Sequence, residues 1–123
     1  MIRRAQVKDA EAIAGVHIDS WRAAYRGQMP DQVLDALDVT QRAQQWEEWL
    51  EQPQLSVFVA TVDGTVEGFC CLCPTRDEDA RDTVGEIPAL YVLPSHWRRG
   101  IGRLLCERTL AEARKREFEE VSL

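Results

Sequence analysis

The deciding stretch of this sequence reads Glu86-Ile-Pro-Ala-Leu-Tyr-Val-Leu-Pro-Ser-His-Trp-Arg-Arg-Gly-Ile-Gly-Arg103. Its apolar first half predicts a strand, its prolines a turn, and its Gly-x-Gly the start of a helix. A helix N-terminus exposes unpaired backbone N–H groups and partial positive charge, which suits a phosphate. Gly100 and Gly102 carry no Cβ to keep a ligand from the backbone. Three arginines add positive charge beside them: Arg98, Arg99 and Arg103. The stretch therefore predicts a site for a phosphate-bearing ligand.

Two common phosphate-binding motifs do not fit this turn. A dinucleotide-binding fingerprint requires a third glycine at position 105, which is Leu105. A P-loop requires Gly-Lys-Ser/Thr, which the sequence lacks.

The residues around the turn narrow the interpretation. The segment Arg98-Arg99-Gly100-Ile101-Gly102, after Leu90-Tyr91-Val92-Leu93-Pro94, resembles the acetyl-CoA-binding motif of the GNAT superfamily of N-acetyltransferases. The resemblance extends to Ser20–Gly27 and to the Asp63-Gly64 turn followed by Val66-x-Gly68. Trp97 departs from the Gln or Arg that usually opens the motif. The family also continues with a helix that carries a Tyr or Ser general acid and with two more strands, so we expect a C-terminally shortened member.

The resemblance implies a reaction and a set of site residues. It implies direct transfer of an acetyl group from acetyl-CoA to an amine, with no metal. Glu86 is the candidate general base, and a glutamate facing solvent at the end of a strand is the alternative. The implied cofactor-binding residues are Leu90, Tyr91, Val92, Arg98, Arg99, Gly100, Ile101, Gly102 and Arg103. An ordinary core strand and a solvated arginine cluster are the alternatives for these.

The acceptor side is expected near the first helix. The resemblance places the acceptor, a small-molecule or peptide amine, beside Trp21 and Tyr25, with His17 close by. Packing in the core is the alternative for Trp21 and His17. The acidic segment 77–82 is a candidate attractor for a cationic amine, or else a solvated loop.

Composition bounds the class of protein. At 123 residues we expect a single domain spanning 1–123. The formal net charge of −6 argues against a general nucleic-acid binder. No apolar run is long enough to cross a membrane, and we see no signal peptide. The cysteines form no zinc pattern, so we interpret them as buried free thiols of a cytoplasmic protein. They are Cys70, Cys71, Cys73 and Cys106.

The pattern along the chain predicts a mixed α/β (α+β) fold in the order β-α-α-β-β-β-α-β, the GNAT-like acyl-CoA N-acyltransferase arrangement. Expected strands span 2–6, 55–62, 65–73, 84–93 and 118–123, and expected helices begin at Asp9, near Thr40 and at Gly102. The 102–117 helix is expected to turn Leu104 inward and Glu112 outward. The last strand should pair parallel to 84–93. Its outer edge has no expected partner, so we predict a homodimer through this edge.

Two other interpretations remain beside an active acetyltransferase. One is a non-catalytic acyl-CoA-binding or regulatory module. The other is a fragment of a longer acetyltransferase.

Overall fold

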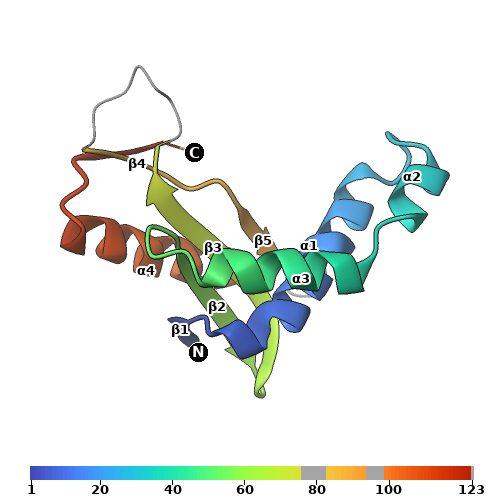
Figure 1. The fold of residues 1–123 in the computed structure, drawn as a ribbon, viewed down its shortest axis with the longest axis horizontal. Helices are drawn as coiled ribbons and strands as arrows, with labels where there is room; N and C mark the ends of the chain where they lie inside the picture. The colour runs from blue at the N-terminus through green and yellow to red at the C-terminus, as the bar shows by residue number, and fades with distance from the viewer. Residues whose placement is uncertain (76–82, 94–98, 123) are drawn as a thin grey trace.

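The computed structural model describes residues 1–75, 83–93 and 99–122. Six strands form one mixed sheet in the order β1-β2-β3-β4-β6, with β5 also paired to β3 (Figure 1). The strands are β1 (Ile2–Arg4), β2 (Ser56–Val62), β3 (Thr65–Pro74), β4 (Val84–Glu86), β5 (Leu90–Val92) and β6 (Glu120–Ser122). The helices are a 3-10 turn η1 (Val7–Asp9), then α1 (Ala10–Tyr25), α2 (Asp31–Asp35), α3 (Val39–Leu50) and α4 (Ile101–Lys115). The predicted mixed fold is confirmed.

The β2–β3 hairpin is the centre of the sheet. Asp63 and Gly64 adopt positive φ angles of 53° and 81° at its turn, as a tight hairpin requires. Successive residues of each strand face opposite sides of the sheet. Val57, Phe69 and Cys71 pack in one buried cluster, whereas Phe58 and Cys70 pack in another. The long apolar runs of both strands are therefore explained by burial on both faces.

The helices divide between these faces. Residues of α1 and α3 join the first cluster, through Ile13 and Trp46, and Leu105 and Ala113 of α4 join the second. In Figure 1, α3 crosses one side of the β2–β3 ribbon, α4 lies on the other, and α2 projects from the end of α1. None of the described helices is long and apolar enough to span a bilayer.

The predicted single strand 84–93 is wrong in one respect, because it is two strands separated by a bulge. Glu86 pairs with Cys73, and the Cys71 amide donates to the Ala89 carbonyl at 3.0 Å. From Cys73 to Cys71, β3 advances two residues, while the opposing segment advances three residues from Glu86 to Ala89. This extra residue defines a β-bulge. Pro88 lies inside it and has no N–H to donate to the sheet. The bulge lets β4 and β5 both pair antiparallel with β3.

The strand after α4 pairs parallel to β4 as predicted, but the residues that α4 buries differ from the prediction. β6 pairs parallel to β4, from Val84↔Glu120 onward. Leu104, expected inward, is 52% exposed, and Glu112, expected outward, is 8% exposed. Glu112 is buried because the Arg4 guanidinium of β1 reaches it at 2.7 Å. The pattern within the helix carried no sign of this partner.

Candidate active site

The N-terminus of α4 is an open turn of backbone. Gly100 is its N-cap, in the left-handed region at φ 80°, and no side chain in the described part of the chain caps the helix. Among the described residues, a Cβ added at Gly100 would meet no atom within 4 Å, and one at Gly102 would meet only Val92 Cγ2, at 3.9 Å. The first amides of a helix have no partner within it. This turn therefore offers N–H groups and open space to an anion.

Charge gathers at the same turn. Arg99 is exposed, and Arg103 is exposed as well, with its Nε 2.9 Å from Glu107 Oε1. Such an exposed i,i+4 pair contributes little to stability, so Arg103 can exchange this partner for a ligand at small cost. Ile101 begins the helix and packs partly against the α4-side core. Arg98 lies outside the described residues.

β5 presents backbone groups at its outer edge. The Leu93 amide donates to the Glu67 carbonyl at 2.9 Å, and Ala89 accepts from Cys71, so these residues bond toward β3. Bonded and outward residues alternate along an antiparallel strand. Tyr91 therefore bonds toward β3, where its register partner is Phe69, whereas the backbone groups of Leu90 and Val92 point outward. Ser20 Oγ lies 3.5 Å from the Val92 carbonyl oxygen.

Gly68 brings β5 and α4 close to the central strand. A Cβ at this position would lie 3.0 Å from the Tyr91 carbonyl oxygen and 3.3 Å from Leu105 Cδ1. Any larger residue would push β5 or α4 outward. Gly68 thus fixes the outward edge of β5 beside the open turn of α4.

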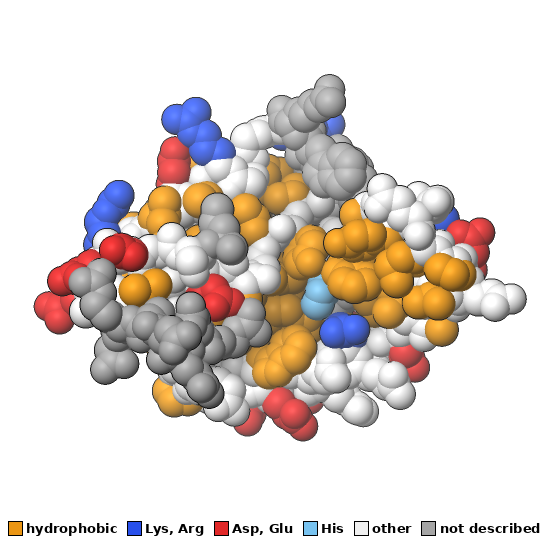
Figure 2. Space-filling model, turned by 90° about the horizontal axis from the view of Figure 1, so that it is seen from above, with side chains coloured by type: hydrophobic (Ala, Val, Ile, Leu, Met, Phe, Trp, Pro, Cys, Tyr) orange, Lys and Arg blue, Asp and Glu red, His pale blue; other side chains and the backbone are white. Residues whose placement is uncertain are grey.

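A cavity of about 680 Å³ opens on the α1 and α3 side of the sheet. Its aromatic wall consists of His17, Trp21, Trp46, Trp49 and Tyr91. Cys71, Cys73, Pro74, Pro88 and Ala89 form the wall on the sheet side. Gln52, Gln54 and Leu55 complete it after α3. Figure 2 shows hydrophobic side chains gathered around a histidine in a hollow of this face.

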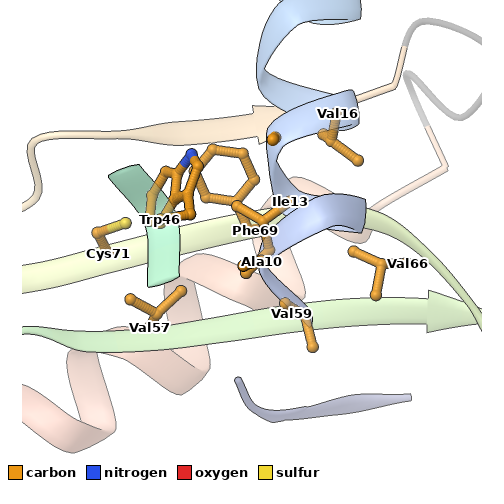
Figure 3. Close-up of a cluster of buried hydrophobic side chains, with 10 residues drawn as sticks. Ala10, Ile13, Val16, Trp46, Val57, Val59, Val66, Phe69 and Cys71 are labelled. Atoms are coloured by element: carbon orange, nitrogen blue, oxygen red, sulfur yellow. The ribbon is translucent and has the colours of Figure 1, made fainter. Parts of the chain in front are cut away.

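The aromatic wall is a packed network of rings. His17 lies 5.1 Å from Tyr91 and 6.0 Å from Trp46 between ring centroids. Trp46 lies 5.1 Å from Phe69, an arrangement that Figure 3 shows beside Cys71. Burial, together with the nearby charge of Arg42, lowers the pKa of His17 to about 4. The imidazole is therefore neutral at pH 7, and it is a weak base.

The two predicted acceptor residues differ in position. Trp21 lines the cavity, and its Nε1 donates to the Tyr91 hydroxyl at 3.1 Å. This bond joins α1 to β5 across the wall. Tyr25 packs on Trp21 at 4.9 Å between centroids, is 38% exposed, and stands outside the cavity wall. The acidic segment 77–82 lies outside the described residues.

Glu86 is half-buried at the end of β4. Its register partners are Cys73 in β3 and Ser122 in β6. Paired residues project from the same face of a sheet, and Cys73 lines the cavity. Glu86 therefore lies on the cavity face, bordering the wall.

The cysteines are buried at positions 70, 71 and 73, as expected, whereas Cys106 is half-buried. All four are free thiols. Burial raises the pKa of Cys70 to about 11 and raises the pKa of Cys71 as well. Both are thus protonated and unreactive at neutral pH. Among the residues that the structure describes, no group of three His, Cys, Asp or Glu side chains could hold a metal ion.

Sequence reasoning missed the α3 side of the cavity. Trp46 and Trp49 stand among charged residues, and only their spacing and size set them apart as a wall. The glutamines after the helix gave no signal at all.

Comparison with known proteins agrees with this geometry. Residues 18–123 match the model of the acetyltransferase (GNAT) family. The chain belongs to the GNAT family. An uncharacterized N-acetyltransferase of Bacillus subtilis, YuaI, is 35% identical over 105 residues, which cover 85% of this chain and 58% of that protein. The chain therefore spans less than two thirds of the length of this relative.

Two solved N-acetyltransferase structures share the fold. PaiA N-acetyltransferase from Thermoplasma acidophilum, in complex with coenzyme A, has a TM-score of 0.76 at 19% identity, over 96% of this chain and 74% of that one. Aminoglycoside N-acetyltransferase AAC(6')-Iy, in complex with CoA, has a TM-score of 0.75 at 19% identity, over 99% of this chain and 74% of that one.

Proposed function

We propose that the protein transfers the acetyl group of acetyl-CoA to a primary amine. The observation that carries this proposal is the pairing of an open helix N-terminus at Gly100 with the outward edge of β5, held together by Gly68. Membership of the GNAT family and the coenzyme A in the PaiA structure support the choice of ligand.

In this proposal the donor lies along one continuous track. The pyrophosphate accepts hydrogen bonds from the first amides of α4, Ile101 to Arg103, with Arg98 and Arg99 adding charge. The pantetheine arm pairs with the outward groups of Leu90, as an added strand pairs with a sheet edge. The backbone of Tyr91 bonds toward β3 and therefore does not pair with the donor. The Tyr91 side chain lines the cavity instead.

The chemical step requires a base and a donor for the developing oxyanion. The amine nitrogen attacks the thioester carbonyl, and its proton passes to Glu86 directly or through water. An outward N–H of β5 stabilises the negative charge on the thioester oxygen. The carbon–sulfur bond then breaks, and the thiolate takes up a proton through water. The products are the acetylated amine and coenzyme A.

Two measurements test this function. Calorimetry of coenzyme A with the wild type tests the donor site, where we expect saturable binding. An acetyl-CoA-dependent thiol-release assay over a panel of amines tests catalysis, with Glu86→Gln against Glu11→Gln, an exposed glutamate of α1. A general base contributes roughly 10²–10⁴-fold, so Glu86→Gln should lose about that factor in kcat while its affinity for coenzyme A is unchanged.

The outcomes separate the interpretations. Equal turnover in the two variants would remove Glu86 from the mechanism. Binding of coenzyme A without turnover of any amine would indicate a non-catalytic acyl-CoA-binding module. No binding would refute the donor site itself.

We also propose a homodimer through β6 in a cytoplasmic protein. β6 bonds to β4 on one side, and no strand in the described part of the chain covers its other edge. An exposed edge favours pairing with a second copy. Four free thiols suit a reducing compartment. Light scattering that gives the mass of a monomer would refute the dimer.

A further inference from the structure

We propose that the amine acceptor is a small arylalkylamine, a single amino group on a short chain that carries an aromatic ring, bound in the cavity of about 680 Å³. This inference rests on the proposed function and names the substrate class of the same site. Its volume falls within the roughly 300–1,000 Å³ of small-molecule sites.

The walls favour an aromatic body. Three tryptophans and a tyrosine face the cavity: Trp21, Trp46, Trp49 and Tyr91. Trp46 and Trp49 meet edge to face at 4.9 Å, with an interplanar angle of 87°. Aromatic rings pack best on one another in such offset or edge-on arrangements. An inserted ring thus continues a network that the protein already builds.

The walls disfavour a polycation. None of the described residues that line the cavity is Asp, Glu, Lys or Arg. An aminoglycoside carries several ammonium groups, and among the described residues Glu86 at the border of the wall offers a carboxylate to one of them, so taking the others out of water unpaired is costly. A single amine loses its charge before it reacts, so only one group must be desolvated. Until then its ammonium form is attracted to the faces of the tryptophans.

The cavity also borders the residues proposed to bind the donor and to act as the general base. Tyr91 contributes a wall of the cavity, and the adjacent Leu90 and Val92 turn their backbone groups to the donor edge. Cys73 lines the cavity and pairs with Glu86. An aromatic ring held among the tryptophans leaves a short chain to carry the amine toward this junction.

The first test measures binding without acetyl-CoA. Tryptamine and phenethylamine are titrated into the protein by calorimetry, beside hexylamine as the aliphatic match and kanamycin as the polycation. We expect saturable binding of the aromatic amines at concentrations about tenfold below those needed for hexylamine, and no binding of kanamycin. Equal or tighter binding of hexylamine or kanamycin would overturn the inference.

The second test places the ligand in the cavity. Trp49 is 37% exposed, so its truncation leaves most of the core intact. Trp49→Ala should raise KM for tryptamine about tenfold, while the affinity for coenzyme A stays unchanged. Val33→Ala, at an exposed position of α2 outside the wall, is the control and should change neither value. Trp49→Phe should recover part of the loss.

The two proposals fail in different ways. Turnover of hexylamine, kanamycin or a peptide N-terminus in preference to tryptamine would refute the acceptor class and leave the acetyltransferase intact. Absence of coenzyme A binding would refute the acetyltransferase, while the calorimetric titration of the amines would still decide whether the cavity takes an arylalkylamine. An unchanged KM in Trp49→Ala would refute the placement.

Discussion

A matched pair of glycines separates backbone strain from ligand binding. Gly100 and Gly64 have φ angles of 80° and 81°, and a Cβ at either would meet no atom of the described residues within 4 Å. Alanine at either position is forced toward the left-handed region, at a cost of about 1–2 kcal/mol. Gly100→Ala and Gly64→Ala should therefore lose similar stability in urea unfolding, each with an unchanged m-value.

Only one of the two variants should lose affinity for coenzyme A. The Cβ at Gly100 occupies the space through which a phosphate approaches the amides of α4, whereas Gly64 lies at the hairpin turn. Losing one hydrogen bond to a charged oxygen costs about 1.5–3 kcal/mol, which is tenfold or more in Kd. Calorimetry should show this loss for Gly100→Ala alone. Equal affinities in the two variants would refute the phosphate site at Gly100.

Three further predictions concern stability. Burial lowers the pKa of His17 to about 4 from an ordinary 6.5, so the unfolded chain binds more protons than the folded chain between these pH values. The free energy of unfolding should therefore fall as pH drops from 6.5 to 4. His17→Phe should flatten this pH dependence. Arg4→Ala removes the 2.7 Å partner of the buried Glu112 carboxylate and leaves Arg108 Nη1 at 3.9 Å. It should cost about 1.5–3 kcal/mol in urea unfolding, with part recovered by adding Glu112→Gln. Gly85→Ala puts a Cβ 2.8 Å from the Phe118 ring and should lower stability by about 1–3 kcal/mol, seen as a lower thermal midpoint.

The features that the sequence predicted correctly depend on residues next to one another in the chain. Asp63-Gly64 between two β-branched runs is sufficient to define a hairpin, because the turn type depends on these two residues alone. The Gly-x-Gly after an apolar run likewise marked the open turn of α4. Both features are confirmed in the fold.

Non-local partners account for what was missed. Glu112 looked like a surface residue of a helix, and its ion pair with Arg4, 108 residues away, buries it. The bulge at Pro88 depends on the register against β3, although the proline itself was a sign of irregularity. The cavity depends on how α3 packs over the sheet, which no spacing within α3 reveals.

Chemical-shift mapping of backbone amides during titration with coenzyme A tests whether the donor lies along β5 and the start of α4. We expect saturable shifts for Leu90 on β5 and for Ile101 and Gly102 at the start of α4, with Gly64 in the hairpin unmoved. Saturable shifts confined to other parts of the chain, with these three amides unchanged, would contradict it.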